Sequence, residues 1–303
     1  MNFGKFAFRI IDYIYYPFQN YKKFKDVEVE KNIVYQDAHK RCKYDIYYKK
    51  TDEAMPVLVN FHGGGWLAGD KKYRKSLAEY YASKGWFVVN AGYRLGPECP
   101  FPAQIEDSIN CLNHLPTLKE RFNLDFSKVV ITGDSAGAHI SACTIAAITD
   151  ENYRKALEVP VPAVVPTALV GFCGPYDIKE MTNFKLLPPA VRSLMKGFTG
   201  HKYKKDYSDY EEFKFHKELS PINFVNEKWP KSLIVHAEKD IFCAGHGQAL
   251  IKALEENGVE AKEFSTKKLT ENHCFHLIFY KKVSKRAFEE VFKFLDEIKN
   301  DAQ

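Results

Sequence analysis

The sequence predicts an α/β protein in which a mostly parallel sheet is flanked by helices, and three observations predict this class. First, 303 residues with 45% hydrophobic content can bury one large core, so no second domain is required. Second, apolar stretches of strand length alternate with stretches of helical periodicity. Third, residues 129–139 run from an apolar β-rich stretch through Gly-x-Ser-x-Gly into a small-residue helical stretch. We therefore expect a single domain over residues 1–303.

The first elements precede the alternating part of the chain. Residues 2–24 place bulky apolar groups on one side of a helix, and such a helix needs a surface to cover. It could pack on the body of the fold, form a lid over an apolar site, or anchor the chain to a membrane. We disfavour the membrane because the first 14 residues hold only two cations and one acid. Residues 27–35 and 43–48 have the alternating pattern of antiparallel strands.

The alternating part begins with residues 56–62, a near-continuous apolar run of the kind that a parallel sheet buries. A helix closed by Gly85 follows, and Pro100 and Pro102 introduce another. The expected order is helix 71–85, strand 86–93, helix 101–118, strand 128–132, a helix from residue 136, strands 166–174 and 231–237, helix 245–257, strand 260–268 and helix 284–299. Residues 175–224 interrupt this order with a basic, aromatic insertion whose length is typical of a lid.

Composition and charge exclude several classes of function. The net charge of +5 comes from 44 basic and 39 acidic residues spread along the chain, so we expect no nucleic-acid partner. Seven cysteines at irregular spacing, without a CxxC pair, indicate reduced thiols rather than a disulfide framework or a zinc site. The N-terminus lacks the pattern of a secretory signal, and no run of 18 apolar residues occurs. We therefore expect a cytoplasmic protein.

The strand, turn and helix around Ser135 have the pattern of a nucleophile elbow. Gly133 and Gly137 remove the side chains that would collide in so tight a reversal. The helix that begins at Ala136 directs its free N–H groups and the positive end of its dipole at the place where an oxyanion would form. The alternative is a glycine-rich turn with a capping serine. The strand before the turn and the helix after it favour the nucleophile.

A serine nucleophile needs a base and an acid that holds the base, and in such sheets these follow later in the chain in the order Ser, Asp, His. Asp240 comes just after the strand 231–237, and we favour it over Glu238 because it follows the strand end at loop distance. His273 and His276 both lie on the loop after the last expected strand. Position alone leaves the choice between these two histidines open.

Residues 62–66 read His-Gly-Gly-Gly-Trp directly after a buried strand. Three consecutive glycines are costly in conformational entropy, so bare backbone is expected to have a use there, such as hydrogen bonding to a substrate oxygen. The alternative is a plain bend. We expect His62 to orient this loop by a hydrogen bond to its backbone, and His139 to be a packing residue.

These motifs together resemble the hormone-sensitive-lipase-like branch of the α/β-hydrolases, over the chain from about residue 56 to the end. The resemblance is carried by HGGGW at 62–66, GDSAG at 133–137, YRLGPE at 93–98 followed by FPA at 101–103, Asp107, GPYD at 174–177 and SP at 220–221. The family usually has YRLAPE, so Gly96 is a small departure, and Asp240-Ile241-Phe242 is a looser match to its DPL-like context. The resemblance implies an α/β-hydrolase fold whose helical cap is formed by about 1–24 and by the insertion 175–224.

The resemblance also implies the chemistry of a serine carboxylesterase. Its histidine typically precedes a small residue and Phe, as His273 does and His276 does not, so it selects Ser135, Asp240 and His273 as catalytic residues. The N–H groups of Gly63, Gly64 and Ala136 are then expected to form the oxyanion hole. No metal or organic cofactor is implied.

The expected substrates are small-molecule esters with short acyl or aryl groups. Two alternatives remain at this stage: an amide or formamide hydrolase resembling arylformamidases on the same triad, and a non-catalytic small-molecule receptor. The sequence leaves open whether edge strands or the last helix pair two subunits into a homodimer.

Overall fold

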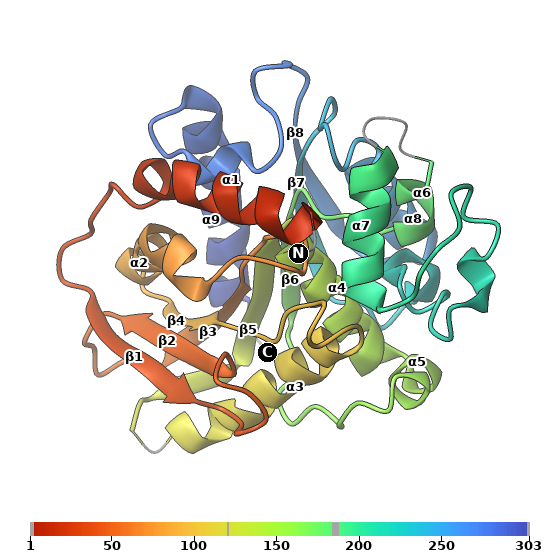
Figure 1. The fold of residues 1–303 in the computed structure, drawn as a ribbon. Coiled ribbons are helices and arrows are strands. Elements are labelled where there is room, and N and C mark those ends of the chain that lie inside the picture. Colours follow the sequence, from red (N-terminus) through yellow and green to blue (C-terminus); the bar gives the residue numbers. More distant parts are fainter. Residues whose placement is uncertain (1–2, 120, 184–187, 302–303) are drawn as a thin grey trace.

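A twisted eight-stranded sheet runs through the part of the chain that the computed structural model describes, which is residues 3–119, 121–183 and 188–301 (Figure 1). Its strand order is β1-β2-β4-β3-β5-β6-β7-β8. The strands are β1 (Glu28–Val34), β2 (Lys43–Tyr48), β3 (Met55–Phe61), β4 (Phe87–Ala91), β5 (Leu124–Asp134), β6 (Ala168–Phe172), β7 (Lys231–Ala237) and β8 (Ala261–Thr266). The pairs β1–β2 and β2–β4 are antiparallel and all the others are parallel. The predicted mostly parallel sheet is confirmed.

Helices cover both faces of this sheet. Side chains alternate along a strand, so in β3 Val57 and Val59 belong to one buried apolar cluster and Leu58 belongs to the other. The first cluster includes α3 (Ala103–His114), α4 (Ala136–Thr149) and α8 (His246–Glu256). The second includes α2 (Lys75–Ser83) and α9 (Lys282–Asn300). This is the layering that alternating strands and helices predict.

The structure divides some predicted helices and extends one strand. The helix expected at 71–85 is a 3₁₀ turn, η1 (Lys71–Arg74), followed by α2, and the helix expected at 101–118 is α3 followed by η2 (Leu115–Leu118). Strand β5 begins at Leu124, earlier than expected, because it pairs with β3 on both sides of a bulge. A short helix that was not predicted, α5 (Glu151–Ala156), follows α4 and is capped by Asp150.

The two segments outside the alternating pattern lie together. Helix α1 (Phe3–Gln19) contacts α7 (Pro188–Thr199), which belongs to the insertion, and Figure 1 shows α1 in red beside α7. The insertion also contains α6 (Ile178–Met181), η3 (Tyr210–Glu212) and η4 (Pro221–Phe224), while its residues 184–187 lie outside the described part. None of the helices in the described ranges is long and apolar enough to cross a membrane.

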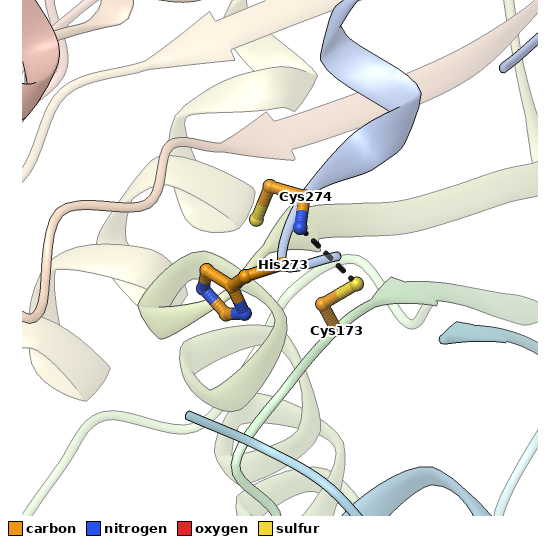
Figure 2. Close-up of side chains that lie close together, drawn as sticks. All are labelled: Cys173, His273 and Cys274. Carbon is orange, nitrogen blue, oxygen red and sulfur yellow. Dashed lines mark hydrogen bonds between the residues drawn. The ribbon is translucent and has the colours of Figure 1, made fainter. Parts of the chain in front are cut away.

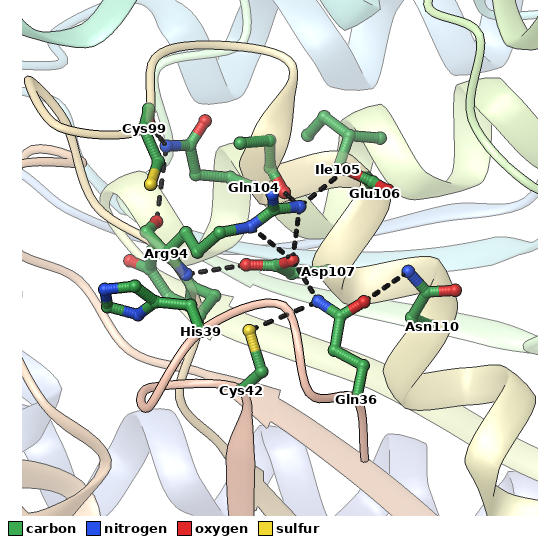
Figure 3. A network of polar contacts seen from close by, with 12 residues as sticks. Gln36, His39, Cys42, Arg94, Cys99, Gln104, Ile105, Glu106, Asp107 and Asn110 are labelled. Carbon is green, nitrogen blue, oxygen red and sulfur yellow. Dashed lines mark hydrogen bonds and ion pairs between the residues drawn. The ribbon is translucent and has the colours of Figure 1, made fainter. Parts of the chain in front are cut away.

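A buried polar network fixes the segment that follows β4 (Figure 3). Asp107 of α3 is fully buried and accepts hydrogen bonds from the backbone N–H (2.6 Å) and the Nε (2.8 Å) of Arg94. The Arg94 guanidinium also pairs with Glu106 at 2.5 Å. The neighbouring Tyr93 donates its hydroxyl to the carbonyl oxygen of His62 at 2.6 Å. Tyr93 therefore ties the YRLGPE stretch to the glycine-rich loop, and the fully buried carboxylate of Asp107 has its hydrogen bonds satisfied by Arg94.

The departure at Gly96 has a packing reason. A Cβ at this position would lie 2.1 Å from the carbonyl oxygen of Gly197 in α7 and 2.8 Å from a methyl carbon of Leu67. The backbone N–H of Gly96 donates to the carbonyl oxygen of Trp66 at 3.0 Å. A glycine here thus allows α7 to lie directly against the glycine-rich loop, as an alanine would not without a shift of the helix.

Candidate active site

Ser135 lies at the apex of the turn between β5 and α4, with a positive φ of 52°. Side chains on its flanking glycines would not fit: a Cβ on Gly137 would lie 2.0 Å from the carbonyl oxygen of Phe61, and one on Gly133 would lie 2.4 Å from the carbonyl carbon of Gly137. The backbone N–H of Ser135 donates to the carbonyl oxygen of Phe172 at 2.8 Å. The strained turn is therefore held on both sides by neighbouring strands.

The structure brings Ser135, His273 and Asp240 into one hydrogen-bonded chain. His273 Nε2 lies 2.9 Å from Ser135 Oγ, and His273 Nδ1 lies 2.8 and 3.0 Å from the two carboxylate oxygens of Asp240. With the Nδ1 proton donated to Asp240, Nε2 is left to accept the serine hydroxyl. This is the geometry in which an imidazole can remove a proton from a serine.

His273 and Asp240 shift each other's pKa. Burial by itself lowers the pKa of His273, but the carboxylate of Asp240 outweighs burial and holds the pKa well above its usual value. The pKa of Asp240 is below its usual value, because its attraction to His273 and its hydrogen bonds outweigh the effect of burial. Two of those bonds come from the backbone N–H groups of Phe242 and Cys243, at 2.8 and 3.0 Å.

These shifts predict how any reaction in which Ser135 acts as the nucleophile depends on pH. Only the neutral imidazole can accept the serine proton, so kcat/KM is expected to fall as the pH drops through an apparent pKa above 6.5. Asp240→Asn removes the charge that raises this pKa, so the acidic limb should move to lower pH while the rate at its plateau falls by about 10³- to 10⁴-fold. The measurement is kcat/KM against pH for both forms. An acidic limb at the same pH in both forms would contradict the assignment.

The rival acid and base lie elsewhere. His276 is fully buried, its ring is stacked on Phe172 with centroids 4.1 Å apart, and burial lowers its pKa to about 3. Neither ring nitrogen of His276 has a hydrogen-bond partner among the described residues. Glu238 accepts a hydrogen bond from Ser265 Oγ and does not contact His273. Among the described residues, Asp240 rather than Glu238 holds His273, and His273 rather than His276 contacts Ser135.

The glycine-rich loop, residues 62–66, lies beside Ser135. Gly64 has φ of +130° and lines the pocket beside Ser135, and a Cβ on it would lie 2.4 Å from the carbonyl oxygen of Ala68. Ala136 is the first residue of α4, so its N–H has no acceptor within the helix. His62 Nδ1 lies 2.7 Å from the carbonyl oxygen of Gly63, which confirms the expected contact with the loop backbone. Burial lowers the pKa of His62 to about 4, so the ring is a neutral donor there.

His139 is buried as expected, and both of its ring nitrogens are hydrogen-bonded. Its Nδ1 accepts from Nε1 of Trp66 at 3.2 Å, and its Nε2 lies 2.8 Å from the carbonyl oxygen of Leu219. The indole of Trp66 is stacked on Phe198 of α7 with centroids 4.2 Å apart. The elbow helix, the glycine-rich loop and the insertion therefore meet at this histidine.

A buried ion pair beneath the elbow was not found by sequence reasoning. Asp134, the residue before the serine, accepts from Nε and Nη2 of Arg74, both at 2.6 Å, and both side chains are buried. Burial would raise the pKa of Asp134, but Arg74 outweighs it and leaves the pKa below its usual value. Nη1 of Arg74 also donates to Gln19 at the end of α1. Nothing in the sequence pairs these residues, which are 60 positions apart.

Removing one member of this pair should destabilise the fold strongly. Arg74→Met leaves a buried carboxylate without its partner, so we expect a loss of about 3 to 5 kcal/mol in the free energy of unfolding. The matched control is Arg121→Met, because Arg121 pairs with Glu30 at the surface and its removal should change stability little. Urea unfolding of the two variants measures the difference. If both variants lost the same free energy of unfolding, the buried pair would stabilise the fold no more than the surface pair does.

Asn272 also escaped the sequence analysis, although it precedes the catalytic candidate His273 directly. Its Oδ1 accepts from the backbone N–H of Ile241 (3.0 Å) and of His273 (2.8 Å), and its Nδ2 donates to the carbonyl oxygen of Lys239 (2.9 Å). One side chain thus joins the loop of the acid to the loop of the base. Asn commonly bonds to nearby backbone in this way, which was the available signal.

Thiols surround the histidine, and Figure 2 shows Cys173 and Cys274 beside His273. The backbone N–H of Cys274 donates to Cys173 Sγ at 3.4 Å, and all seven cysteines are free. Two groups have ligand atoms spaced for a metal ion, Cys173 with His273 and Cys274, and Asp240 with Cys243 and His273. Both groups use His273, whose nitrogens already contact Asp240 and Ser135. A metal in either group would compete with that hydrogen-bonded chain.

The triad opens into a pocket of about 340 Å³ whose accessible surface is mostly apolar, although Arg74, Asp134 and Lys281 also belong to its lining. Ser135, His273 and Gly64 lie in it together with Ile241 and Phe242 of the loop after β7. Helix α1 contributes one side with Ile11, Tyr15 and Gln19. A small concave site with a few polar groups at one place is typical of a small-molecule site.

Comparison with known proteins gives one family match and many relatives. The family model described as BD-FAE matches residues 44–254. The "Putative alpha/beta hydrolase R526" of Acanthamoeba polyphaga mimivirus is 26% identical over 266 residues, covering 86% of this chain and 71% of the relative. "Esterase LipQ" of Mycobacterium tuberculosis is 26% identical over 213 residues, covering 69% of this chain and 48% of the relative, so the match spans about half the length of that protein.

Among solved structures, a "C6-C4 SN3 inhibited ESTERASE B" from Lactobacillus rhamnosis is similar with a TM-score of 0.82. The two are 21% identical, and the match covers 97% of this chain and 93% of the other. The predicted α/β-hydrolase fold is confirmed by this likeness and by the sheet described above.

Proposed function

The chain belongs to the BD-FAE family, and from this premise we propose that it is a serine carboxylesterase that hydrolyses short-chain acyl or aryl esters through an acyl-enzyme. The observation that carries the proposal is the hydrogen-bonded chain of Ser135, His273 and Asp240 in an apolar pocket. The resemblance to hormone-sensitive-lipase-like esterases agrees with the names of the relatives, which favour neither a formamide hydrolase nor a receptor.

In the proposed mechanism His273 carries one proton through an acylation step and a deacylation step. Ser135 Oγ attacks the ester carbonyl while His273 Nε2 takes its proton, and Asp240 holds the ring by Nδ1 and stabilises the imidazolium. The C–O bond then breaks, and His273 gives the proton to the departing alkoxide. Water enters, gives a proton to His273 and attacks the acyl carbonyl, and Ser135 leaves with that proton. The products are a carboxylic acid and an alcohol.

The oxyanion of each tetrahedral intermediate needs donors that are already in place. We assign this role to the N–H groups of Gly63, Gly64 and Ala136, supported by the position of the glycine-rich loop beside Ser135 and by the start of α4 at Ala136. Hydrogen bonds fixed before the reaction avoid the cost of reorienting water, so they stabilise the transition state more than the ester.

The size of the substrate follows from the pocket. A volume of about 340 Å³ is at the small end for ligand sites, which supports short acyl groups and small alcohols. We assign α1 and the insertion 175–224 to a cap, because α1 both lines the pocket and contacts α7. The seven free cysteines support work in a reducing compartment, and we propose the cytoplasm.

The proposal is tested by initial rates on p-nitrophenyl esters from acetate to decanoate. We expect turnover with a steep fall beyond butyrate, because longer chains exceed the pocket. N-formylkynurenine is the matched control for formamide hydrolysis. A strong preference for the formamide over p-nitrophenyl acetate would contradict the ester assignment.

A further inference from the structure

Exposed apolar side chains gather around the entrance to the pocket. The described part of the chain leaves sixteen large apolar side chains exposed, and eight of them belong to α1. Five more lie on segments at or beside the pocket: Tyr21, Ile241, Phe242, Leu269 and Tyr280. The rings of Tyr21 and Tyr280 are in edge contact, which joins the end of α1 to the loop before α9. Exposed apolar side chains gathered in this number beside a pocket indicate an interaction surface.

Helix α1 presents this surface because its apolar side chains cover a wide arc of the helix and only part of that arc faces the pocket. Ile11 and Tyr15 are four residues apart and line the pocket. At about 100° per residue, Ile14 and Ile10 lie about 60° and 100° around the helix from Ile11, and Tyr13 lies about 160° from it, so these three form an outer face turned away from the pocket. Ile14 is 54% exposed and Tyr13, next to it, is 82% exposed. The described residues provide no partner that buries this outer face.

We propose that this face docks on an anionic lipid surface, with the pocket entrance turned toward the lipid. An amphipathic helix that lies in an interface carries bulky apolar and aromatic residues on one face and cations beside them. Tyrosine suits that position because its ring is apolar and its hydroxyl is polar. The delivery of lipid-dissolved esters to Ser135 rests on the proposed esterase function, whereas the docking does not.

The charge beside the face matches an anionic surface. Residues 1–25 hold five cations and one acid, so they carry +4 of the chain's net charge of +5. Lys22, Lys23 and Lys25 follow α1 and are exposed, and Lys281 and Lys282 follow Tyr280. None of these five lysines forms a salt bridge with an acid of the described residues. Lys22, Lys23 and Lys25 lie after the helix, outside the 14 residues whose low charge weighs against a membrane contact.

The same charges argue against a second copy of the chain as the occupant. A two-fold symmetric contact through α1 would bring two equal groups of lysines together, and like charges across an interface are costly. Anionic lipid headgroups instead neutralise them, and each lysine close to such a surface adds to the binding. We therefore commit to lipid.

The test is flotation of the full chain with vesicles of phosphatidylcholine alone and of phosphatidylcholine with phosphatidylserine. We expect binding to the anionic vesicles that weakens with added salt. Ile14→Asp should lower that binding by about tenfold or more, because it places a charge on the apolar face. The double variant Lys23→Glu and Lys25→Glu should lower it by at least about tenfold as well. The matched control is Val161→Asp, an exposed apolar residue away from α1 that should bind as the unchanged protein does.

Hydrolysis of p-nitrophenyl acetate in the absence of vesicles, together with urea unfolding, checks that each variant is folded. Because flotation needs no catalysis, a protein that floats but does not hydrolyse esters would refute the proposed function and leave docking intact. No binding to anionic vesicles, or equal binding of Ile14→Asp and the unchanged protein, would overturn the proposal. So would a dimer in sedimentation that Ile14→Asp converts to a monomer while vesicles remain unbound.

Discussion

Ser135→Ala is expected to lower kcat/KM for p-nitrophenyl acetate by at least about 10⁴-fold without unfolding the protein. The hydroxyl lies 2.9 Å from His273 Nε2, and alanine has no oxygen that could form the acyl-enzyme. Residual rate would come from the oxyanion donors and from binding alone. The backbone of the turn is held by the contact of the Ser135 N–H with Phe172, which alanine keeps.

Ser141, in the helix α4 that follows Ser135, provides the control substitution. Ser141 is buried in α4 and its hydroxyl donates to the carbonyl oxygen of Gly137 at 2.9 Å, away from His273. Ser141→Ala should therefore keep most of the activity. If Ser135→Ala kept activity within tenfold of the unchanged protein, the nucleophile would lie elsewhere.

His273→Ala and His276→Ala should differ by at least about 10³-fold in kcat/KM, although the residues are three positions apart. His273 contacts both Ser135 and Asp240, so its loss removes the base. His276 contacts neither, since it is stacked on Phe172 and its nitrogens have no partner among the described residues. Its loss should lower stability through the cavity that it leaves and keep the chemistry.

The same p-nitrophenyl acetate assay measures both variants, with urea unfolding to correct for any unfolded fraction. An inactive His276→Ala that is fully folded, beside an active His273→Ala, would show that the base is misassigned.

The sheet and the elbow could be predicted because their signals are local. Apolar runs of strand length and the two glycines around Ser135 each depend on a short stretch of sequence. The order Ser, Asp, His spans much of the chain, but it follows from the order of the strands. The choice of His273 over His276 needed the family resemblance, because both residues lie on one loop. The structure separates them by direction: the ring of His273 points to Ser135, and that of His276 packs on Phe172.

The features that could not be predicted depend on contacts between distant parts of the chain. Arg74 and Asp134 are far apart in sequence and carry no shared motif, yet they form a buried pair beneath the nucleophile. Asn272 looked like an ordinary loop residue until its contacts with Lys239 and Ile241 were visible. The periodicity of α1 predicted an apolar face, but periodicity cannot tell whether the body of the protein covers that face. The structure leaves it exposed at the pocket entrance.

Covalent labelling is the measurement that shows whether Ser135 is the nucleophile of an esterase. The protein is incubated with a fluorophosphonate, the mass of the intact chain is measured, and the modified residue is located by peptide mapping. We expect one phosphonyl group per chain, on Ser135, and none on Ser135→Ala. Label on another residue, or no label on a folded protein that hydrolyses p-nitrophenyl acetate, would show that Ser135 is not the nucleophile.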